Sequence, residues 1–116
     1  MAIIRITDLT LKAIIGTNDW ERTTKQNIVI NAVIEYNASK AIATDNIREA
    51  LDYKTITKKI LAQVKNSKFY LLEKLTAFVL EIILENKKVK KATVRIDKPL
   101  ALRFARSVSV ELSRTR

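Results

Sequence analysis

The spacing of apolar residues changes twice along the chain, and this change limits the folds that the sequence can adopt. Apolar side chains first alternate with period two, as in β-strands, then recur every three or four positions, as on amphipathic helices, and finally alternate again. These patterns predict two strands, two helices and two further strands, around residues 4–15, 27–36, 56–64, 71–83, 92–97 and 107–113.

The order β-β-α-α-β-β predicts an α+β fold with a four-stranded antiparallel sheet and both helices on one face. The 116 residues fit a single domain, 1–116. A slip of phase at Thr7–Asp8 predicts a bulge in the first strand, and apolar residues on both faces of residues 27–36 predict a central strand. The last two strands have a polar face opposite the helices. That face fits either a solvated monomer or several copies joined around a wet interior.

The residue types that are missing exclude several classes of active site. The chain has no Cys and no His, and Gly16 is its only glycine. These absences exclude thiolate nucleophiles, zinc–sulfur sites, P-loops and dinucleotide-binding glycine motifs. If the chain is an enzyme, its acid–base groups must therefore be Asp, Glu, Lys or Tyr, and the lack of His and Cys agrees with a site that uses neither a metal nor an organic cofactor. No apolar run reaches the roughly 18 residues that a membrane span needs, so a cytoplasmic protein without a membrane partner is expected.

The chain is strongly basic, with 22 Lys and Arg against 12 Asp and Glu and a formal net charge of +10. Such a charge fits a nucleic acid, a phosphorylated metabolite or simply a soluble surface. The densest basic run, residues 87–91, lies at a predicted helix-to-strand junction, where a solvated turn explains it. Few aromatic residues and no recognisable motif disfavour a nucleic-acid partner.

Four side chains are candidates for binding or catalysis, and each also has an ordinary structural explanation. Lys98 directly follows the third strand and precedes Pro99, so it is either a positioned base or a surface lysine. Glu73 begins the second helix, where a carboxylate favours the helix dipole or accepts paired N–H donors from an aminopyrimidinone edge. Glu21 lies in a polar loop, and Tyr53 precedes the first helix, where its ring packs locally or stacks on a flat heterocycle.

Five short segments, taken together, resemble the dihydroneopterin aldolase family in order and spacing. The resemblance runs from Ile4 to Leu112. It implies the tunnelling fold, a reduced pterin substrate, and a homo-octamer of two tetrameric rings with active sites between subunits. The segments are Gly16…Glu21…Gln26, Asp45-Asn46-Ile47, Leu51-Asp52-Tyr53, Leu71-Leu72-Glu73-Lys74-Leu75 and Ile96-Asp97-Lys98-Pro99.

Within this family the chain is similar to the dihydroneopterin triphosphate 2′-epimerase branch. The runs Ala101–Ala105 and Ser107–Ser109 resemble the epimerases, whereas aldolases usually have a proline-rich turn and a Val-Gly-(Val/Ile)-Glu strand here. Pro99 and Arg106 depart from the epimerase pattern, in which His and Asp are expected. The resemblance implies epimerisation at C2′ of the pterin side chain, with aldolase cleavage in folate synthesis as the main alternative. A non-catalytic nucleic-acid-binding module is a remote alternative.

The resemblance also implies roles for individual residues. Lys98 is implied to be the general base, assisted by Tyr53 and Glu21. The implied substrate-binding residues are Glu73, Leu72, Tyr53, Glu21 and Asp52. A triphosphate would also favour basic groups near the end of the pterin side chain, for which the candidates are Arg22, Lys25, Arg103 and Arg106.

Overall fold

The computed structural model describes residues 1–116 and has the predicted order of long elements. The strands are β1 (Ala2–Ile15), β2 (Gln26–Tyr36), β3 (Lys68–Phe69), β4 (Val89–Pro99) and β5 (Ser107–Thr115). The helices are α1 (Ser39–Thr44), α2 (Tyr53–Lys65) and α3 (Leu72–Leu84). Two 3₁₀ turns are η1 (Asp19–Arg22) and η2 (Ile47–Glu49).

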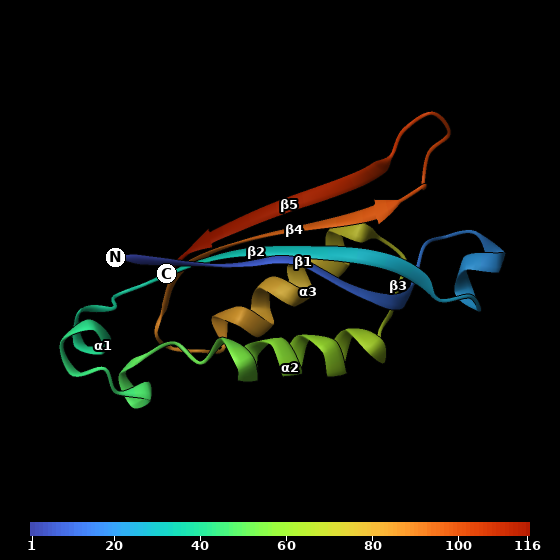
Figure 1. The fold of residues 1–116 in the computed structure, drawn as a ribbon. Coiled ribbons are helices and arrows are strands. Elements are labelled where there is room, and N and C mark those ends of the chain that lie inside the picture. The colour runs from blue at the N-terminus through green and yellow to red at the C-terminus, as the bar shows by residue number, and fades with distance from the viewer.

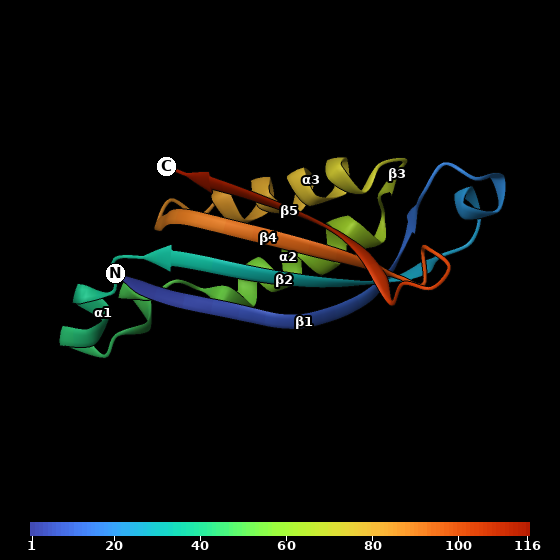
Figure 2. The same ribbon diagram turned by 90° about the horizontal axis from the view of Figure 1, so that it is seen from above.

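The strands form one sheet in the order β3-β1-β2-β4-β5. All four long strands pair antiparallel, and β2 is the central strand, as predicted. Both long helices, α2 and α3, cover one face of this sheet, and no helix covers the other face (Figures 1 and 2). The predicted sheet with both helices on one face is therefore confirmed. None of the helices is long and apolar enough to cross a membrane.

The core lies between the helices and the sheet face that they cover. Every second residue of β2 and β4 points into it, because side chains alternate along a strand, and each helix adds a stripe at three- and four-residue spacing. Burying one such aliphatic side chain contributes about 1.5–3 kcal/mol. The fully or almost fully buried residues include Ile28, Ile30, Ile34, Ile56, Ile60, Val64, Leu75, Val79, Ile83, Val94 and Ile96.

A bulge interrupts β1 where the sequence predicts it. The pairing of β1 with β2 shifts between Ile6 and Leu9, and Asp8 has a φ of 56° in the left-handed region. Its N–H donates a 2.9 Å hydrogen bond to Oδ1 of Asn31 on β2. An extra residue resets the alternation of side chains, so both halves of the long strand keep their apolar residues on the core side.

Several short elements were not predicted from periodicity. The two-residue strand β3 pairs in parallel with the end of β1, through Ile14 and Ile15, and so adds a fifth strand to the four that we expected. The region 37–52, which shows no clear period, contains α1 and η2. Elements this short span too few repeats of a pattern to be recognised from it. β3 nevertheless matters for the site, because it holds the start of α3 beside the end of β1.

Candidate active site

A buried ion pair lies at the end of the sheet where β1 finishes. Nζ of Lys98 donates to Oε2 of Glu21, and the two side chains are only 15% and 6% exposed. Lys98 alternates with Val94 and Ile96 along β4 and therefore points toward the helix side of the sheet. Two residues that the sequence singled out separately, 77 positions apart, thus meet in the folded chain.

The position of Lys98 differs slightly from the prediction that it directly follows the strand. β4 continues through Pro99, and the last two pairs of the β4–β5 ladder are Lys98 with Val108 and Pro99 with Ser107. Pairing with β5 keeps the backbone extended for two residues more than periodicity indicates. Lys98 is therefore held by the sheet itself, which makes it a rigid support for an amine.

Glu21 is a charged carboxylate held by several donors. Besides Lys98, Nε2 of Gln26 donates to Oε2 of Glu21 at 3.0 Å, and the backbone N–H of Asn18 donates to its Oε1 at 3.2 Å. Burial by itself raises the pKa of Glu21, but the hydrogen bonds from Lys98, Gln26 and Asn18 outweigh it and lower that pKa to about 2. The carboxylate is therefore ionised at neutral pH, although it is 4% exposed.

Gly16 lies directly against this carboxylate. A Cβ atom at position 16 would be 2.2 Å from Cδ of Glu21, and the φ of Gly16 is +129°. Only glycine fits such a contact and such a backbone conformation without strain. The single glycine of the chain thus allows the loop to fold back onto β1 and to enclose Glu21.

The start of α3 lies at the same end of the molecule as the ion pair. The N–H of Gly16 donates to the carbonyl of Phe69 at 3.3 Å, so the loop that holds Glu21 touches the strand that leads into α3. Leu72 is half-buried and Glu73 is exposed in the first turn of α3. Unpaired N–H groups of a first helical turn and a nearby carboxylate form a mixed donor and acceptor edge.

Tyr53 and Asp52 lie at the opposite end of the molecule. The start of α2 is close to α1, whereas the Glu21 loop and β3 are at the far end in Figure 1. The 13 residues of α2 span about 20 Å. Tyr53 is 51% exposed, beside a hollow lined by Ile47, Leu51, Asp52, Tyr53 and Lys54. Within one chain, these residues do not join the Glu21–Lys98 pair.

Asp52 has a structural task at the start of α2. Its Oδ1 accepts from the backbone N–H of Thr55 at 3.0 Å, and its Oδ2 accepts from the Thr55 hydroxyl at 2.8 Å. The backbone N–H and then the hydroxyl of Thr55 lower the pKa of Asp52 below its usual value. Asp52 therefore caps the helix, of which Tyr53 is the first residue.

The four basic residues predicted to contact phosphate are not gathered in one place. The guanidinium of Arg22 donates to three main-chain carbonyls. While those bonds last, its N–H donors are not available to a phosphate. Lys25 borders a hollow against β1 and α2. Arg103 lies beside the fully exposed ring of Phe104, 6.0 Å from its centroid, in the β4–β5 connection.

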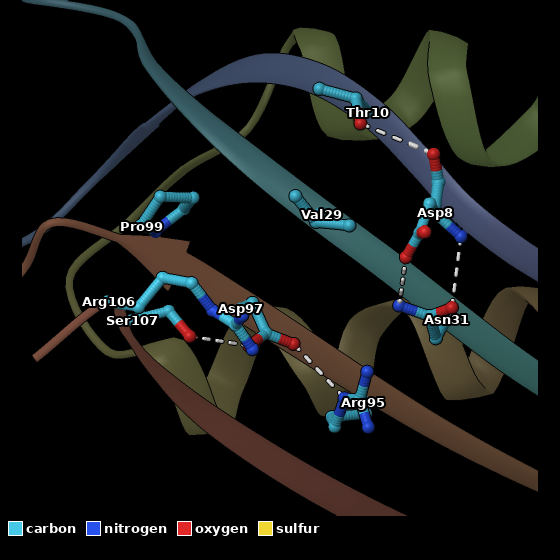
Figure 3. Close-up of a pocket in the computed structure, with 9 residues that line it drawn as sticks. All are labelled: Asp8, Thr10, Val29, Asn31, Arg95, Asp97, Pro99, Arg106 and Ser107. Carbon is cyan, nitrogen blue, oxygen red and sulfur yellow. Dashed lines mark hydrogen bonds and ion pairs between the residues drawn. The ribbon is translucent and has the colours of Figure 1, made fainter.

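Arg106 lines a different hollow, on the sheet face that no helix covers. This hollow has a volume of about 570 Å³ and is bordered by Asp8, Thr10, Val29, Asn31, Arg95, Asp97, Pro99, Arg106 and Ser107. Figure 3 shows Asp97 between Arg95 and Ser107, to which it is bonded at 3.0 and 2.7 Å. Because Asp97 and Lys98 are neighbours on β4, their side chains point to opposite faces. Arg106 and the Glu21–Lys98 pair therefore line opposite faces of the sheet.

Sequence reasoning gave no role to Gln26, although it belongs to the resembling series Gly16…Glu21…Gln26. Its Nε2 donates to both Glu21 and the carbonyl of Ile15, at 3.0 and 2.8 Å. An amide can make both bonds from its two N–H groups. Its place in that series was the available signal for a role.

Solved structures share this fold over the whole chain. The structure of dihydroneopterin aldolase from Escherichia coli in complex with neopterin superimposes with a TM-score of 0.92 and 28% identity. The match covers 98% of this chain and 99% of that chain. The protein therefore belongs to the class of tunnelling-fold proteins, and it has a carboxylate–amine pair at the end of its sheet.

The sequence comparisons identify the family within this class. A family described as dihydroneopterin aldolase matches residues 4–113, and the chain belongs to this family. It is 45% identical to a dihydroneopterin triphosphate 2′-epimerase of Pseudomonas aeruginosa, over 97% of this chain and 92% of that protein. It is 50% identical to the protein of the same name from Escherichia coli K12, over 97% of this chain and 93% of that protein.

Proposed function

We propose that this protein epimerises C2′ of the side chain of 7,8-dihydroneopterin triphosphate by a retro-aldol and aldol sequence. The observation that carries the proposal is the buried Glu21–Lys98 pair, which supplies an acid–base couple at a rigid strand end. The identities of 45% and 50% to epimerases, against 28% to the aldolase structure, support the epimerase branch. We also propose that the protein acts in the cytoplasm.

In this proposal the pterin ring binds edge-on to the start of α3. The carboxylate of Glu73 accepts hydrogen bonds from the exocyclic amino group and the neighbouring ring N–H. A backbone group near Leu72 bonds the same edge of the ring. A carboxylate with two oxygens matches two parallel N–H donors. The side chain of the pterin then extends toward Glu21 and Lys98, where Glu21 accepts hydrogen bonds from its hydroxyls.

The bond that breaks is C1′–C2′. Lys98, through a water molecule, takes the proton of the 2′-hydroxyl, so that C2′ becomes an aldehyde carbon. The electron pair of the broken bond moves into the C6–N5 unit of the ring. Lys98 accepts the hydroxyl proton as a free amine and then passes it to N5, which restores the amine. Charge is then balanced at every stage, and no additional oxidant or reductant is needed.

The fate of the aldehyde fragment distinguishes the two activities of the family. Rotation of the fragment followed by re-addition to C1′ inverts C2′ and gives the epimer. Protonation of C1′ followed by release of the fragment gives 6-hydroxymethyl-dihydropterin, the aldolase outcome. Both reactions use one intermediate, so retention of the fragment decides the product. The triphosphate offers further contacts that keep the aldehyde fragment bound, and Lys25 and Arg103 are the proposed contact residues.

We propose further that the site is completed by a second copy of the chain in an octamer of two tetrameric rings. Tyr53 begins α2 and Lys98 lies near the end of β4; the start of α2 and the end of β4 are at opposite ends of the molecule (Figure 1). Tyr53 is 51% exposed beside a hollow. A neighbouring subunit would bring its Tyr53 to the pterin that this subunit holds. The ring of Tyr53 then stacks on the pterin, and its hydroxyl assists proton transfer.

One assay tests the reaction directly. The purified protein is incubated with dihydroneopterin triphosphate and, separately, with dihydroneopterin. Stereoisomers are then resolved by chromatography, and released aldehyde is trapped and quantified. We expect the triphosphate to be converted mainly into the 2′-epimer with little aldehyde. Release of aldehyde in proportion to the pterin consumed would identify an aldolase instead.

A mixing experiment tests whether the site is shared. Lys98→Ala and Tyr53→Ala chains, each inactive alone, are unfolded together and refolded at equal amounts. If each site takes Lys98 from one chain and Tyr53 from another, roughly a quarter of the sites in the mixed assembly contain both native groups. Recovery of about that fraction of activity is expected. No recovery, in assemblies that size-exclusion chromatography shows to be mixed, would mean that one chain supplies both groups.

A further inference from the structure

Arg22, the last residue of η1, connects two segments of the chain that are distant in sequence. Its Nη1 donates to the carbonyls of Gly16 at 2.9 Å and Phe69 at 3.0 Å. Its Nη2 donates to the carbonyl of Lys68 at 2.5 Å. The guanidinium carbon also lies 3.8 Å from the centroid of the Tyr70 ring. One side chain therefore joins the loop after β1 to the whole of β3 and to the residue that follows it.

This arrangement depends on the shape of the guanidinium group. Its donors are fixed in one plane, so it bonds several carbonyls at once while its flat face stacks on an aromatic ring. Hydrogen bonds from a charged donor are stronger than those between neutral groups. A lysine ammonium is a point charge without a flat face and cannot reproduce the full set.

The two joined segments hold the two acids of the proposed site. Glu21 immediately precedes Arg22 in η1, and Glu73 follows Tyr70 by three residues. The carbonyl of Gly16, which Arg22 holds, belongs to the residue that lies against the Glu21 carboxylate. Arg22 therefore acts on the distance between the loop that carries Glu21 and the helix start that carries Glu73.

We propose that Arg22 is a positioning residue that fixes the Glu21 loop against the segment leading into α3. This proposal rests on the proposed function, in which Glu21 and Glu73 bind opposite ends of one substrate. Arg22 does not touch the substrate. Its partners are main-chain carbonyls and an aromatic ring, none of which changes charge during the reaction.

The chemistry explains why such a support is needed. In the structure Lys98 holds the Glu21 carboxylate through an ion pair. During turnover Lys98 is a free amine before it takes the hydroxyl proton and again after it gives that proton to N5. Its attraction for Glu21 is then weaker, and the loop would depend on the bonds from Gln26 and Asn18. The bonds of Arg22 persist through this step. They keep Glu21 in place for re-addition of the fragment, where a displacement of about 1 Å can reduce the rate about a hundredfold.

Trp20 makes the proposal testable without any assay of activity. It is the only tryptophan of the chain, it lies within η1 two residues before Arg22, and it is 57% exposed. Time-resolved fluorescence anisotropy of Trp20 therefore reports the mobility of the turn that carries Glu21. Arg22→Gln and Arg22→Lys are compared with the wild type and with Arg5→Gln, an exposed arginine near the other end of β1.

We expect faster local motion of Trp20 in Arg22→Gln and, to a smaller extent, in Arg22→Lys. We also expect kcat to fall by about tenfold or more in Arg22→Gln, with KM for the triphosphate and binding of neopterin changed less than about twofold. Arg5→Gln should match the wild type in every measurement. If Arg22→Gln does not fold, the same measurements are made on Arg22→Lys.

Three results would change the conclusion. Wild-type Trp20 mobility together with wild-type kcat in both Arg22 variants would overturn the positioning role. A raised KM for the triphosphate alone, with unchanged Trp20 mobility, would overturn it in favour of a direct phosphate contact. If the wild-type protein converts no pterin, the proposed function fails, whereas Trp20 mobility still shows whether Arg22 holds the loop.

Discussion

The two ends of the molecule are built in opposite ways. At the end with the Glu21 loop, the charged groups are buried and bonded to one another. Lys98, Gln26 and Asn18 all donate to Glu21. At the other end, Tyr53 is 51% exposed, and the exposed side chains of Ile42 and Ile47 lie near it in the chain. One end is thus organised within a single chain, while the other presents its functional candidate outward.

The Glu21 end is thus arranged before a ligand binds, whereas the Tyr53 end, in the proposed octamer, depends on contacts from outside its own chain. A buried carboxylate with its own donors keeps its charge and geometry without a ligand, which is preorganisation. Tyr53 lies at a helix start and is 51% exposed, so its side chain is not enclosed in this way. Substitutions at the Glu21 end should therefore affect both stability and turnover. Substitution of Tyr53 itself should affect turnover alone.

The largest effect is expected for Lys98→Met. Loss of a general base reduces turnover by about a hundredfold to ten-thousandfold, and an unpaired buried Glu21 costs about 3–5 kcal/mol of unfolding free energy. Assays of kcat and urea unfolding measure both, with Lys91→Met, an exposed lysine on the same strand, as the control. The double variant Glu21→Gln/Lys98→Met should regain stability but not activity. Retained stability in the single variant would show that the pair is not coupled to folding.

The second largest effect is expected from acid, which should lower the unfolding free energy through Glu21. The folded pKa of Glu21 is about 2, below its ordinary value of 4.5. A depressed pKa contributes stability above the unfolded value, and that stability is lost as pH falls through the folded value. The contribution at neutral pH is about 3 kcal/mol, lost between about pH 4.5 and 2. Urea midpoints across this range should fall more steeply in wild type than in Glu21→Gln/Lys98→Met. Parallel curves would contradict the shift.

Gly16→Ala should destabilise the protein by about 2–3 kcal/mol, because the new methyl group meets the Glu21 carboxylate and the backbone is left-handed. A double-mutant cycle with Glu21→Ala separates the two causes. In the Glu21→Ala background the added methyl group has room, so the same change should cost only about 1 kcal/mol. Equal costs in both backgrounds would mean that backbone strain alone is responsible.

Tyr53→Phe should have the smallest effect on folding. Removing a half-exposed hydroxyl changes the unfolding free energy by less than about 0.5 kcal/mol, whereas kcat should fall by about tenfold if the hydroxyl assists proton transfer. Tyr36→Phe, which alters a tyrosine that is 7% exposed, is the matched control for activity. A clear loss of stability in Tyr53→Phe would contradict the contrast between the two ends.

The long elements could be predicted because each spans several repeats of its pattern. β3 could not, since Lys68 and Phe69 are too few to show a period, and its partner strand lies more than fifty positions earlier. Lys98 and Glu21 were singled out by their places in the sequence and given roles by the family resemblance, yet no local pattern indicates that residues 77 positions apart touch. Arg22 was a candidate phosphate contact because a triphosphate favours basic groups, and no sequence pattern indicates that its guanidinium binds main-chain carbonyls.

The contact between Gly16 and Glu21 also restricts the order in which this loop can change. Any side chain at position 16 collides with the present carboxylate, so position 16 is closed to substitution until position 21 has become smaller. Shortening position 21, however, removes the partner of Lys98. Any series of single substitutions that changes this loop therefore begins with a step that harms the site. Homologues that keep the reaction should retain Gly16 and Glu21 together.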